Sequence, residues 1–496
     1  MIRACVAVQT RLIGVSIPLE RVEESIWEIP KSYSPVMKVP ARIFADELLL
    51  KKMKEDRTLL QAVNVASLPG LHKYSIALPD AHEGYGFPIG GVAAEDSESG
   101  VISPGGVGYD INCGVRLIRT NLTVSDVRPV LGELLEELYR GIPSGVGSEG
   151  KLHFTPEGLD PVAQDGAHWV VSKGYGWEED TEHAEEGGRL DWADPSKLTQ
   201  TARKRGSNQL GTLGSGNHFA EVEVADQIFD EAAAKAMGIT QKGQVLVLVH
   251  TGSRGFGHQT CSDYLRVMED LMRRVNLVLP DRELAAGPVT AKETENYLGA
   301  MASAANFAWA NRQVITHRIR QAFSKVFKQD PEKLDMHLVY DVCHNIVKRE
   351  EHDVNGHRRV VYVHRKGATR SFPPGSQQVP DDYRNIGQPV LIPGSMGTAS
   401  WVLKGGQRSM QLTFGSAAHG AGRFMSRSAA RRKHEYNELV GGLRGRGILV
   451  RASSRDTVVE ESPDAYKDVD KVVEVTHNLG LAFKVVRMVP IGVVKG

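Results

Sequence analysis

The segment Gln244-Val-Leu-Val-Leu-Val-His250-Thr-Gly-Ser-Arg-Gly255 contains the pattern that decides the fold, an aliphatic run that ends in a histidine and a glycine-rich loop. Such a β-branched run predicts a buried strand. The same design recurs in His337-Leu-Val-Tyr-Asp-Val before His344 and in Arg359-Val-Val-Tyr-Val before His364. Because strands that end in polar loops let a rigid sheet hold a site, we expect a sheet with functional residues at its strand ends.

Apolar residues at three- and four-residue steps predict helices around this sheet. The predicted helices cover residues 124–139, 226–237, 263–278 and 291–327, whereas residues 410–414 are strand-like and the acidic stretch 177–195 suggests a solvated surface loop. The last two helices predict an inserted helical arm, about 260–330, between the strands before His250 and His344. No linker or repeat is evident, so we predict one integrated α+β domain over 17–496, with mixed or antiparallel sheets around a central metal cleft.

Composition narrows the class of protein. The 496 residues carry 60 Lys plus Arg and 60 Asp plus Glu, so the net charge does not indicate a nucleic-acid partner. A local basic patch could still bind one. Four cysteines without regular spacing argue against a disulfide framework and favour a reducing compartment. No segment has the ~20 apolar residues of a membrane helix, and Gln9, Thr10 and Arg11 interrupt the apolar start. We expect a cytoplasmic protein without a membrane partner.

Five residues of metal-binding type lie in glycine-rich or strand-end positions. Asp110 and Cys113 are three apart in one loop, and His218, His250 and His344 each adjoin a hydrophobic run. Five ligands exceed the four of a closed zinc site, which suggests an open catalytic ion or two ions that share the cysteine sulfur. Thiolate and imidazole indicate a transition metal of open identity. The alternative is that Cys113 is a small buried hydrophobe and the histidines are core or loop residues.

A sixth residue, His419, stands in the run Gly415-Ser-Ala-Ala-His419-Gly-Ala-Gly-Arg423. Small neighbours leave its ring accessible to a bulky reactant, although a histidine between glycines is more commonly a turn residue.

Several segments could bind phosphate. Gly145-Val-Gly-Ser-Glu-Gly-Lys151 approaches a P-loop, but Leu152 replaces the required Ser or Thr and no strand precedes it, so we reject a P-loop. The turn Pro393-Gly-Ser-Met-Gly-Thr398 offers backbone N–H groups to an anion. Arg423 and Arg427, four apart, would share a helix face beside His419 and suit the phosphates of a strand end, unless they belong to a solvated basic face.

Taken together, the segments resemble the RtcB family of RNA-splicing ligases. The resemblance covers nearly the whole chain from about residue 18 and leaves residues 1–16 as an unassigned N-terminal extension. It rests on motifs that include Pro79-Asp-Ala-His-Glu-Gly-Tyr-Gly-Phe-Pro-Ile-Gly-Gly91, Asp110-Ile-Asn-Cys113-Gly, Gly214-Ser-Gly-Asn-His218, His250-Thr-Gly-Ser-Arg, His344-Asn345, His364-Arg-Lys-Gly-Ala-Thr-Arg, Pro393-Gly-Ser-Met-Gly and His419-Gly-Ala-Gly-Arg.

The resemblance implies a GTP-dependent ligase that joins an RNA 3′-phosphate or 2′,3′-cyclic phosphate to a 5′-hydroxyl in tRNA splicing or RNA repair. It makes His419 the nucleophile that forms a histidine–GMP intermediate, and Cys113 the bridge between two Mn²⁺ ions, with Asp110 and His218 on one and His250 and His344 on the other. The implied nucleotide contacts are Asn217, His218, Phe219, Ala220, Glu221, His344, Asn345, Pro393, Gly394, Ser395, Met396, Ser400, Gly420, Ala421, Gly422, Tyr466 and Lys495.

For RNA we expect contacts from Arg365, Lys366, Arg423 and Arg427. Archease is a candidate helper protein, and we expect a monomer that is neither Rossmann-like nor a P-loop protein. Two alternatives remain: a dinuclear-metal phosphodiesterase that activates water and has no need of His419, and a non-catalytic RNA-binding component of a repair or splicing assembly.

Overall fold

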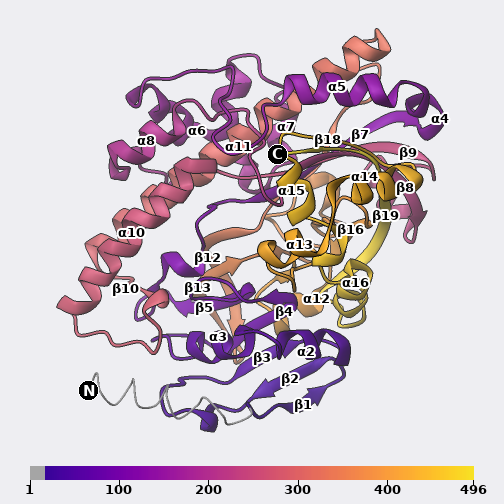
Figure 1. Ribbon diagram of the computed structural model, residues 1–496. Coiled ribbons are helices and arrows are strands. Elements are labelled where there is room, and N and C mark those ends of the chain that lie inside the picture. The colour runs from indigo at the N-terminus through magenta and orange to yellow at the C-terminus, as the bar shows by residue number, and fades with distance from the viewer. Residues whose placement is uncertain (1–16) are drawn as a thin grey trace.

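Two mixed sheets form the framework of the protein, in a computed structural model that describes residues 17–496 (Figure 1). The unassigned segment 1–16 lies outside the described residues. The larger sheet has the order β11-β7-β9-β8-β19-β16-β15, with β18 paired to β19. Its strands are β7 (Gly114–Thr123), β8 (Phe219–Ile228), β9 (Gln244–Thr251), β11 (Leu338–Cys343), β15 (Pro389–Ile392), β16 (Ser400–Gly405), β18 (Leu449–Ala452) and β19 (Ala482–Lys495).

The second sheet has the order β1-β2-β3-β4-β5-β13-β12. It consists of β1 (Glu20–Glu23), β2 (Ile26–Ile29), β3 (Ala41–Phe44), β4 (Ser75–His82), β5 (Ile89–Asp96), β12 (Asn345–Val354) and β13 (His357–Lys366). Among the described strands of the two sheets, only the pairs β3 with β4 and β18 with β19 are parallel. A Rossmann fold needs a mostly parallel sheet, so the sheets confirm the expected mixed α+β class.

Two small ribbons complete the strands. β14 (Ala368–Arg370) pairs with β17 (Ser416–Ala418), and β6 (Val101–Ile102) pairs with β10 (Gly287–Pro288). The chain crosses from the larger sheet to the second sheet at His344, which separates β11 from β12. The two sheets therefore meet at a predicted ligand.

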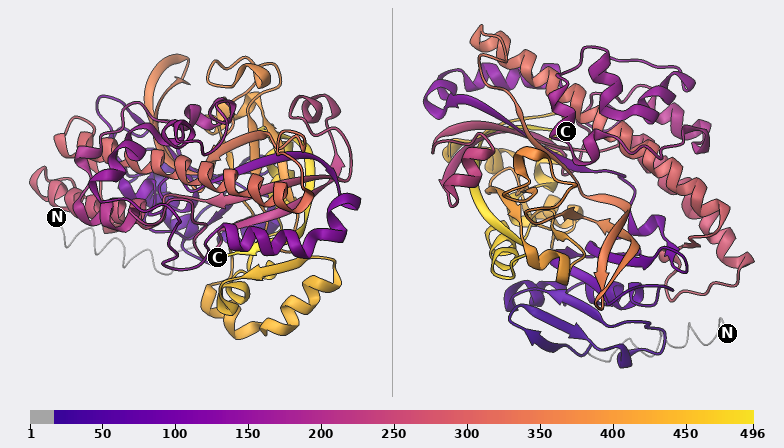
Figure 2. Two further views of the ribbon diagram at one scale, coloured as in Figure 1. Left: turned by 90° about the horizontal axis from the view of Figure 1, so that it is seen from above. Right: turned by 180° about the vertical axis from the view of Figure 1, so that it is seen from behind.

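Two long helices form the predicted arm, α10 (Arg254–Arg274) and α11 (Lys292–Phe327). They lie along one side of the molecule, where α11 packs on α6 (Asp160–Ser172) and α10 on α8 (Gln200–Gly206) (Figures 1 and 2). Most of α11 is buried, including Trp309 and Phe307. The arm is therefore part of the core and supports the sheet, as well as being an insertion between β9 and β11.

The remaining helices are short and surround the sheets (Figure 1). They are α2 (Glu47–Met53), α3 (Thr58–Val65), α4 (Val124–Val127), α5 (Leu131–Gly141), α7 (Glu179–Glu182), α9 (Glu231–Ala236), α12 (Gln407–Leu412), α13 (Arg427–Lys433), α14 (Tyr436–Gly445), α15 (Arg455–Glu460) and α16 (Val469–Asn478). Within residues 17–496, every helix is either too short or too polar to span a bilayer.

Three sequence predictions were wrong in detail. The strand expected over 410–414 is replaced by the end of α12, where the Ser409 hydroxyl donates to the carbonyl oxygens of Ser371 and Gly406 and ties down the turn. The helix expected over 226–237 is only α9, because β8 continues to Ile228 and Asp230 then caps the helix.

The third concerns the acidic stretch 177–195, which is not simply a solvated loop. Asp180 and Glu185 are fully buried. Asp180 pairs with Arg320 of α11 at 2.6 Å, and Glu185 pairs with Lys348 of β12 at 2.5 Å. Because buried carboxylates require partners, these acidic residues belong to the packed interior.

Candidate metal centre and reactive histidine

The five predicted ligands meet at one end of the larger sheet. Asp110 and Cys113 precede β7, His218 precedes β8, His250 belongs to β9, and His344 follows β11. These four strands are consecutive neighbours in the order β11-β7-β9-β8. The sheet therefore brings together residues that are far apart in the sequence.

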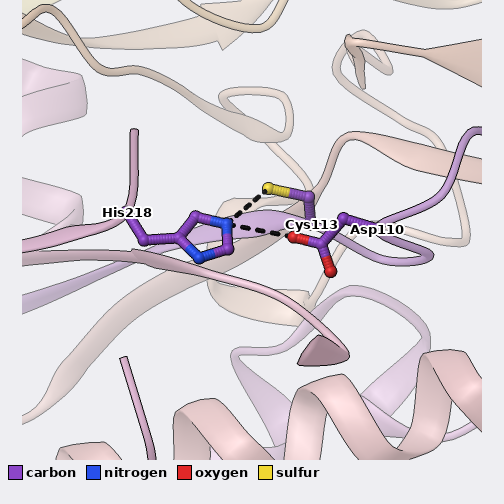
Figure 3. A group of neighbouring side chains, drawn as sticks. All are labelled: Asp110, Cys113 and His218. Atoms are coloured by element: carbon purple, nitrogen blue, oxygen red, sulfur yellow. Dashed lines mark hydrogen bonds and ion pairs between the residues drawn. The ribbon is translucent and has the colours of Figure 1, made fainter. Parts of the chain in front are cut away.

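Asp110, Cys113 and His218 form the tightest group (Figure 3). Nε2 of His218 lies 3.0 Å from Oδ2 of Asp110 and 3.6 Å from Sγ of Cys113, and the three ligand atoms lie within 4.8 Å of one another. Nδ1 of His218 lies 3.1 Å from the carbonyl oxygen of Leu213. A proton on Nδ1 satisfies that contact and leaves the Nε2 lone pair for a metal.

His250 and His344 extend the group on the side of Cys113. Nε2 of His250 lies 3.1 Å from Sγ of Cys113, and the ring centroids of His250 and His344 are 5.7 Å apart. His344 is buried, yet neither of its nitrogens has a hydrogen-bond partner among the described residues. Burial, together with neighbouring histidines, holds the pKa of both residues well below the usual range. Neutral, unpartnered imidazoles are suited to metal ligation.

The residues around Cys113 favour its neutral thiol. Burial and then the Asp110 carboxylate raise the pKa of its thiol well above the usual value. Cysteine binds a metal ion as the thiolate. A bound cation would therefore have to stabilise the deprotonated form of Cys113. A donor set of carboxylate, thiol and imidazoles suits a divalent transition metal.

The α11 helix fixes the loop that carries these ligands. Arg312 is fully buried and donates to the backbone oxygen and to Oδ1 of Asn112, at 2.8 and 3.0 Å, and to the carbonyl of Thr251 at 3.0 Å. Its remaining donors pair with Asp341 at 2.8 Å. Gly252 lets the strand end approach, because a Cβ there would lie 2.5 Å from the Asp110 carboxylate. The geometry of the loop thus depends on the arm.

The expected nucleophile, His419, is held by an aspartate from the second sheet. His419 follows β17, and its Nδ1 lies 2.5 Å from Oδ2 of Asp80 on β4, which also accepts from the His419 backbone N–H at 3.0 Å. Burial alone would raise the pKa of Asp80, but His419 and Lys467 outweigh it and the pKa is lowered. A hydrogen bond from Nδ1–H to an ionised Asp80 selects the tautomer of the neutral ring that has its lone pair on Nε2. Gly422 (φ 74°) permits the approach, because a Cβ there would lie 2.1 Å from the Asp80 carbonyl oxygen.

Two candidate functional residues, Asp80 and Arg254, were not predicted from the sequence. The motif that contains Asp80 was recognised, but no role followed because its partner is 339 residues away. Arg254 is the last residue of the His250-Thr-Gly-Ser-Arg motif, has a positive φ of 58°, and places its guanidinium 3.5 Å from Nδ1 of His218. Its buried Nε has no partner among the described residues. The combination of a left-handed backbone and a buried cation could not be read from the segment.

A cavity of about 190 Å³ opens beside His419, whose side chain is 15% exposed. Of the five predicted metal ligands, His250 lines this cavity. The ring centroids of His344 and His419 are 5.2 Å apart. The cavity therefore adjoins the metal centre. The expected nucleotide contacts that line it are Asn217, Phe219, Pro393, Gly394, Ser395, Met396, Gly420, Ala421, Gly422, Tyr466 and Lys495, joined by the unexpected His82, Ile89 and Glu461.

The other expected nucleotide contacts are not among the residues that line the cavity. Asn345 supports the metal loop, since its amide donates to the Asp110 carbonyl at 3.0 Å and accepts from the Gly367 N–H at 2.8 Å. The Ser400 hydroxyl accepts from the Gly394 N–H at 3.3 Å, which braces the Pro393 turn. The remaining ones that do not line the cavity are His218, Ala220, Glu221 and His344.

Arg423 and Arg427 line the cavity but do not share a helix face, because α13 begins at Arg427. Both arginines pair with an acidic residue that lies far beyond the local stretch of sequence. Arg423 pairs with Glu461 at 2.7 Å and donates to the Tyr466 hydroxyl at 3.1 Å, while Arg427 pairs with the other Glu461 oxygen at 3.1 Å. Arg427 remains 55% exposed, so it is the more available of the two cations.

Arg365 and Lys366 are poorly placed for RNA. Arg365 is fully buried, with its guanidinium paired to Glu350 and hydrogen-bonded to the Ser416 hydroxyl at 2.9 Å. Lys366 is buried and donates to the Tyr85 carbonyl, and burial lowers its pKa to about 8. The structure therefore argues against the RNA contacts expected for these two residues, because both side chains already serve the interior.

The fold and the site define a class of protein: an α+β framework that sets a buried cluster of Asp, Cys and His beside a carboxylate-held histidine. Comparison with known proteins identifies the family. A model of the family described as "tRNA-splicing ligase RtcB" matches residues 61–496. Proteins called tRNA-splicing ligase RtcB are similar over 97% of this chain: 57% identical in Aeropyrum pernix (100% of that protein), 58% in Pyrobaculum aerophilum (100%) and 58% in Thermococcus kodakarensis (99%). The chain belongs to the RtcB family.

Proposed function

We propose that this protein is an RNA ligase that acts in tRNA splicing. It joins an RNA 3′-phosphate, or a 2′,3′-cyclic phosphate opened at the same site, to a 5′-hydroxyl, with GTP as the source of activation. RNA repair is a second use of the same chemistry. Family membership supports the RNA ligase activity, and the His419 geometry supports the covalent route.

The observation that carries the covalent route is the contact between Asp80 and His419. With the proton held on Nδ1 by the Asp80 carboxylate, Nε2 is the free nucleophilic atom of a neutral ring. Nε2 attacks the α-phosphorus of GTP, a P–N bond forms, and the bond to the leaving pyrophosphate breaks. The ring becomes positively charged in this step, and the ionised Asp80 at 2.5 Å stabilises that charge.

The five-residue cluster would hold two divalent ions, with the Cys113 sulfur available as a ligand to both. Asp110 and His218 would complete one ligand set, and His250 and His344 the other. Bound Mn²⁺ would neutralise negative charge on the phosphates during the displacement. The orphaned nitrogens of His344 and the proximity of its ring to His419 support this placement.

The cavity wall suits a guanylate. Lys495 is buried at the end of β19, and the turn from Pro393 to Met396 presents backbone groups beside it. Glu221, on the same face of β8 as Phe219, supplies carboxylate oxygens that match the two N–H donors of guanine. Glu221 is 1% exposed and does not line the cavity, so its contact with the base would require the surrounding side chains to move.

The RNA step follows from the adduct. An oxygen of the RNA 3′-phosphate attacks the phosphorus of His419–GMP, the P–N bond breaks, and the 3′ end carries the guanylate. The 5′-hydroxyl of the second RNA then attacks that end and GMP leaves. Arg427 is the exposed cation at the cavity and is our candidate for the RNA phosphate.

Ligation of defined ends tests the proposal. Purified protein with GTP and MnCl₂ should join an RNA that ends in 3′-phosphate to one that begins with 5′-hydroxyl, whereas 3′-hydroxyl and 5′-phosphate ends should stay apart. Release of phosphate without joining would favour the dinuclear phosphodiesterase. RNA binding without either product would favour a non-catalytic component.

A further inference from the structure

Two glutamates on β8, Glu221 and Glu223, form a buried pair of carboxyl groups. They are two residues apart on one strand, so their side chains lie on the same face. Glu221 is 1% exposed and Glu223 is fully buried. Two adjacent carboxyls of this kind cannot both be ionised without a large cost.

The surroundings provide too few donors for two carboxylates. No described residue donates with ordinary hydrogen-bond geometry to either oxygen of Glu223 or to Oε1 of Glu221. The Ser400 hydroxyl on β16 faces Glu223, and the Lys495 ammonium on β19 faces Glu221.

The other strand packed against the pair is β9. Its residues opposite Glu221 and Glu223 are Leu248 and Leu246, which are apolar and buried. The Lys495 ammonium interacts with Glu461 as well as with Glu221, so it does not neutralise the pair alone. A proton held between the carboxyls would satisfy oxygens that otherwise lack a donor.

The two carboxyls differ in their tendency to ionise. Burial raises the pKa of Glu221 to about 7, while a hydrogen bond from Glu223 and the charge of Lys495 lower it. Burial and the Glu221 charge raise the pKa of Glu223 well above its usual value. The neighbouring strands distinguish the two: Lys495 faces Glu221, whereas Glu223 lies opposite Leu246 of β9 and Pro490 of β19, so a shared proton is placed on Glu223 and the negative charge on Glu221.

We propose that Glu223 is a positioning residue for the nucleotide: it carries a proton and donates it to Glu221, so that Glu221 stays an ionised acceptor for guanine. This inference rests on the proposed function, in which Glu221 contacts the base. Guanine offers N1–H and an amino group to a carboxylate, whereas adenine offers an acceptor at N1. A protonated Glu221 would present a donor that adenine can use. Glu223 therefore supports the choice of GTP over ATP.

Nucleotide binding by Glu223→Leu and Glu223→Gln tests the proposal. The affinity of the wild-type protein for GTP in Mn²⁺ should fall as pH drops below about 7, because Glu221 becomes protonated. Leucine removes the donor, so the pKa of Glu221 rises; we expect the midpoint to move up by about one pH unit and GTP to bind about fivefold more weakly at pH 7. The preference for GTP over ATP should shrink with it.

Glutamine keeps an N–H donor and cannot ionise, so Glu223→Gln should return the midpoint to the wild-type value. Gln227→Leu, at an exposed position of the same strand, is the matched control and should keep the wild-type profile. The proposal is overturned if the Glu223→Leu and wild-type profiles coincide, or if glutamine shifts the midpoint as far as leucine.

Thermal melting tests the shared proton without nucleotide. The folded pKa of Glu223 lies above its unfolded value, so its contribution to stability is complete below about pH 4 and is lost as pH rises. The Glu223→Gln variant has no such loss, so its melting temperature should rise relative to that of the wild type between pH 5 and pH 8. A constant difference would contradict the shared proton. Wild-type protein that binds no GTP would contradict the proposed function and the positioning role, while the melting series would still decide where the proton lies.

Discussion

At the scale of single residues, Asp80 shows how one carboxylate can prepare a nucleophile. Its contact with Nδ1 sets the tautomer of His419 and offsets the charge that forms on the ring. Asp80→Asn keeps the shape but removes the charge, so we expect the rate of adduct formation from GTP to fall by about 10²-fold or more. Rapid-quench kinetics with labelled GTP would measure it.

The His72–Asp96 pair provides a matched control for that substitution, since its two side chains, one in the loop before β4 and one at the end of β5, lie 3.3 Å apart and outside the cavity. Asp96→Asn should leave the rate of adduct formation close to wild type. A rate for Asp80→Asn that also equals wild type would show that the carboxylate does not prepare the ring.

Cys113 supports a second prediction at this scale. A serine hydroxyl stays protonated near neutral pH and cannot replace a bridging thiolate, so Cys113→Ser should lose tightly bound metal and adduct formation while it keeps its fold. Metal titration and circular dichroism would check both. Cys261→Ser is the control, because that thiol is also buried but contacts the Pro104 carbonyl, away from the ligands. Full activity of Cys113→Ser at micromolar Mn²⁺ would contradict the shared sulfur.

At the scale of elements, the segment from His419 into α13 links the cavity to α15. Glu461 is buried and pairs with both Arg423 and Arg427. Arg423 is 17% exposed, and its guanidinium donates to Glu461 and to the Glu460 carbonyl oxygen. We therefore expect Arg423→Ala to cost about 2 kcal/mol of folding free energy and to slow both adduct formation and transfer to RNA.

Arg427→Ala should behave differently, because Glu461 keeps Arg423 as a partner. We expect adduct formation near the wild-type rate, slower transfer of GMP to RNA, and a salt dependence of RNA binding reduced by about one unit of slope. Single-turnover formation and chase would separate the steps. Equal loss in both steps would assign Arg427 a structural role.

The strands and the long helix were predictable from local patterns, whereas the salt-bridge partners were not. The aliphatic run before His250 gave β9, and the periodicity over 291–327 matched α11 to within one residue at its start. Glu461, the partner of Arg423, is 38 residues away in sequence and reaches it only through the folded segment. Sequence spacing indicated a common helix face for Arg423 and Arg427, but the helix begins too late for that.

At the scale of the whole molecule, the arm and the two sheets converge on the site. Arg312 of α11 holds the ligand loop and the end of β9 together. Arg312→Lys cannot make these contacts at once, so we expect a loss of about 3 kcal/mol of folding free energy and weaker metal binding. Denaturant unfolding and metal titration would measure both. Arg274→Lys, on the exposed end of α10, is the control. Unchanged metal affinity in Arg312→Lys would mean that the arm does not position the ligands.

The convergence itself could be predicted only in outline. Motif order and ligand chemistry pointed to the five metal-type residues and to His419, because each lies in a glycine-rich loop or at a strand end. Asp80, Arg254 and Glu223 were not predicted as functional, since their roles depend on contacts between sheets, on a positive φ and on a buried pair. Those are properties of the assembled molecule.

The central claim is that His419 carries the guanylate, and labelling with GTP tests it most directly. Wild-type protein incubated with α-labelled GTP and MnCl₂ should retain label through denaturation and lose it in acid, as a P–N bond does. His419→Ala should take up no label. Label that persists in His419→Ala, or that survives acid in the wild type, would contradict the account.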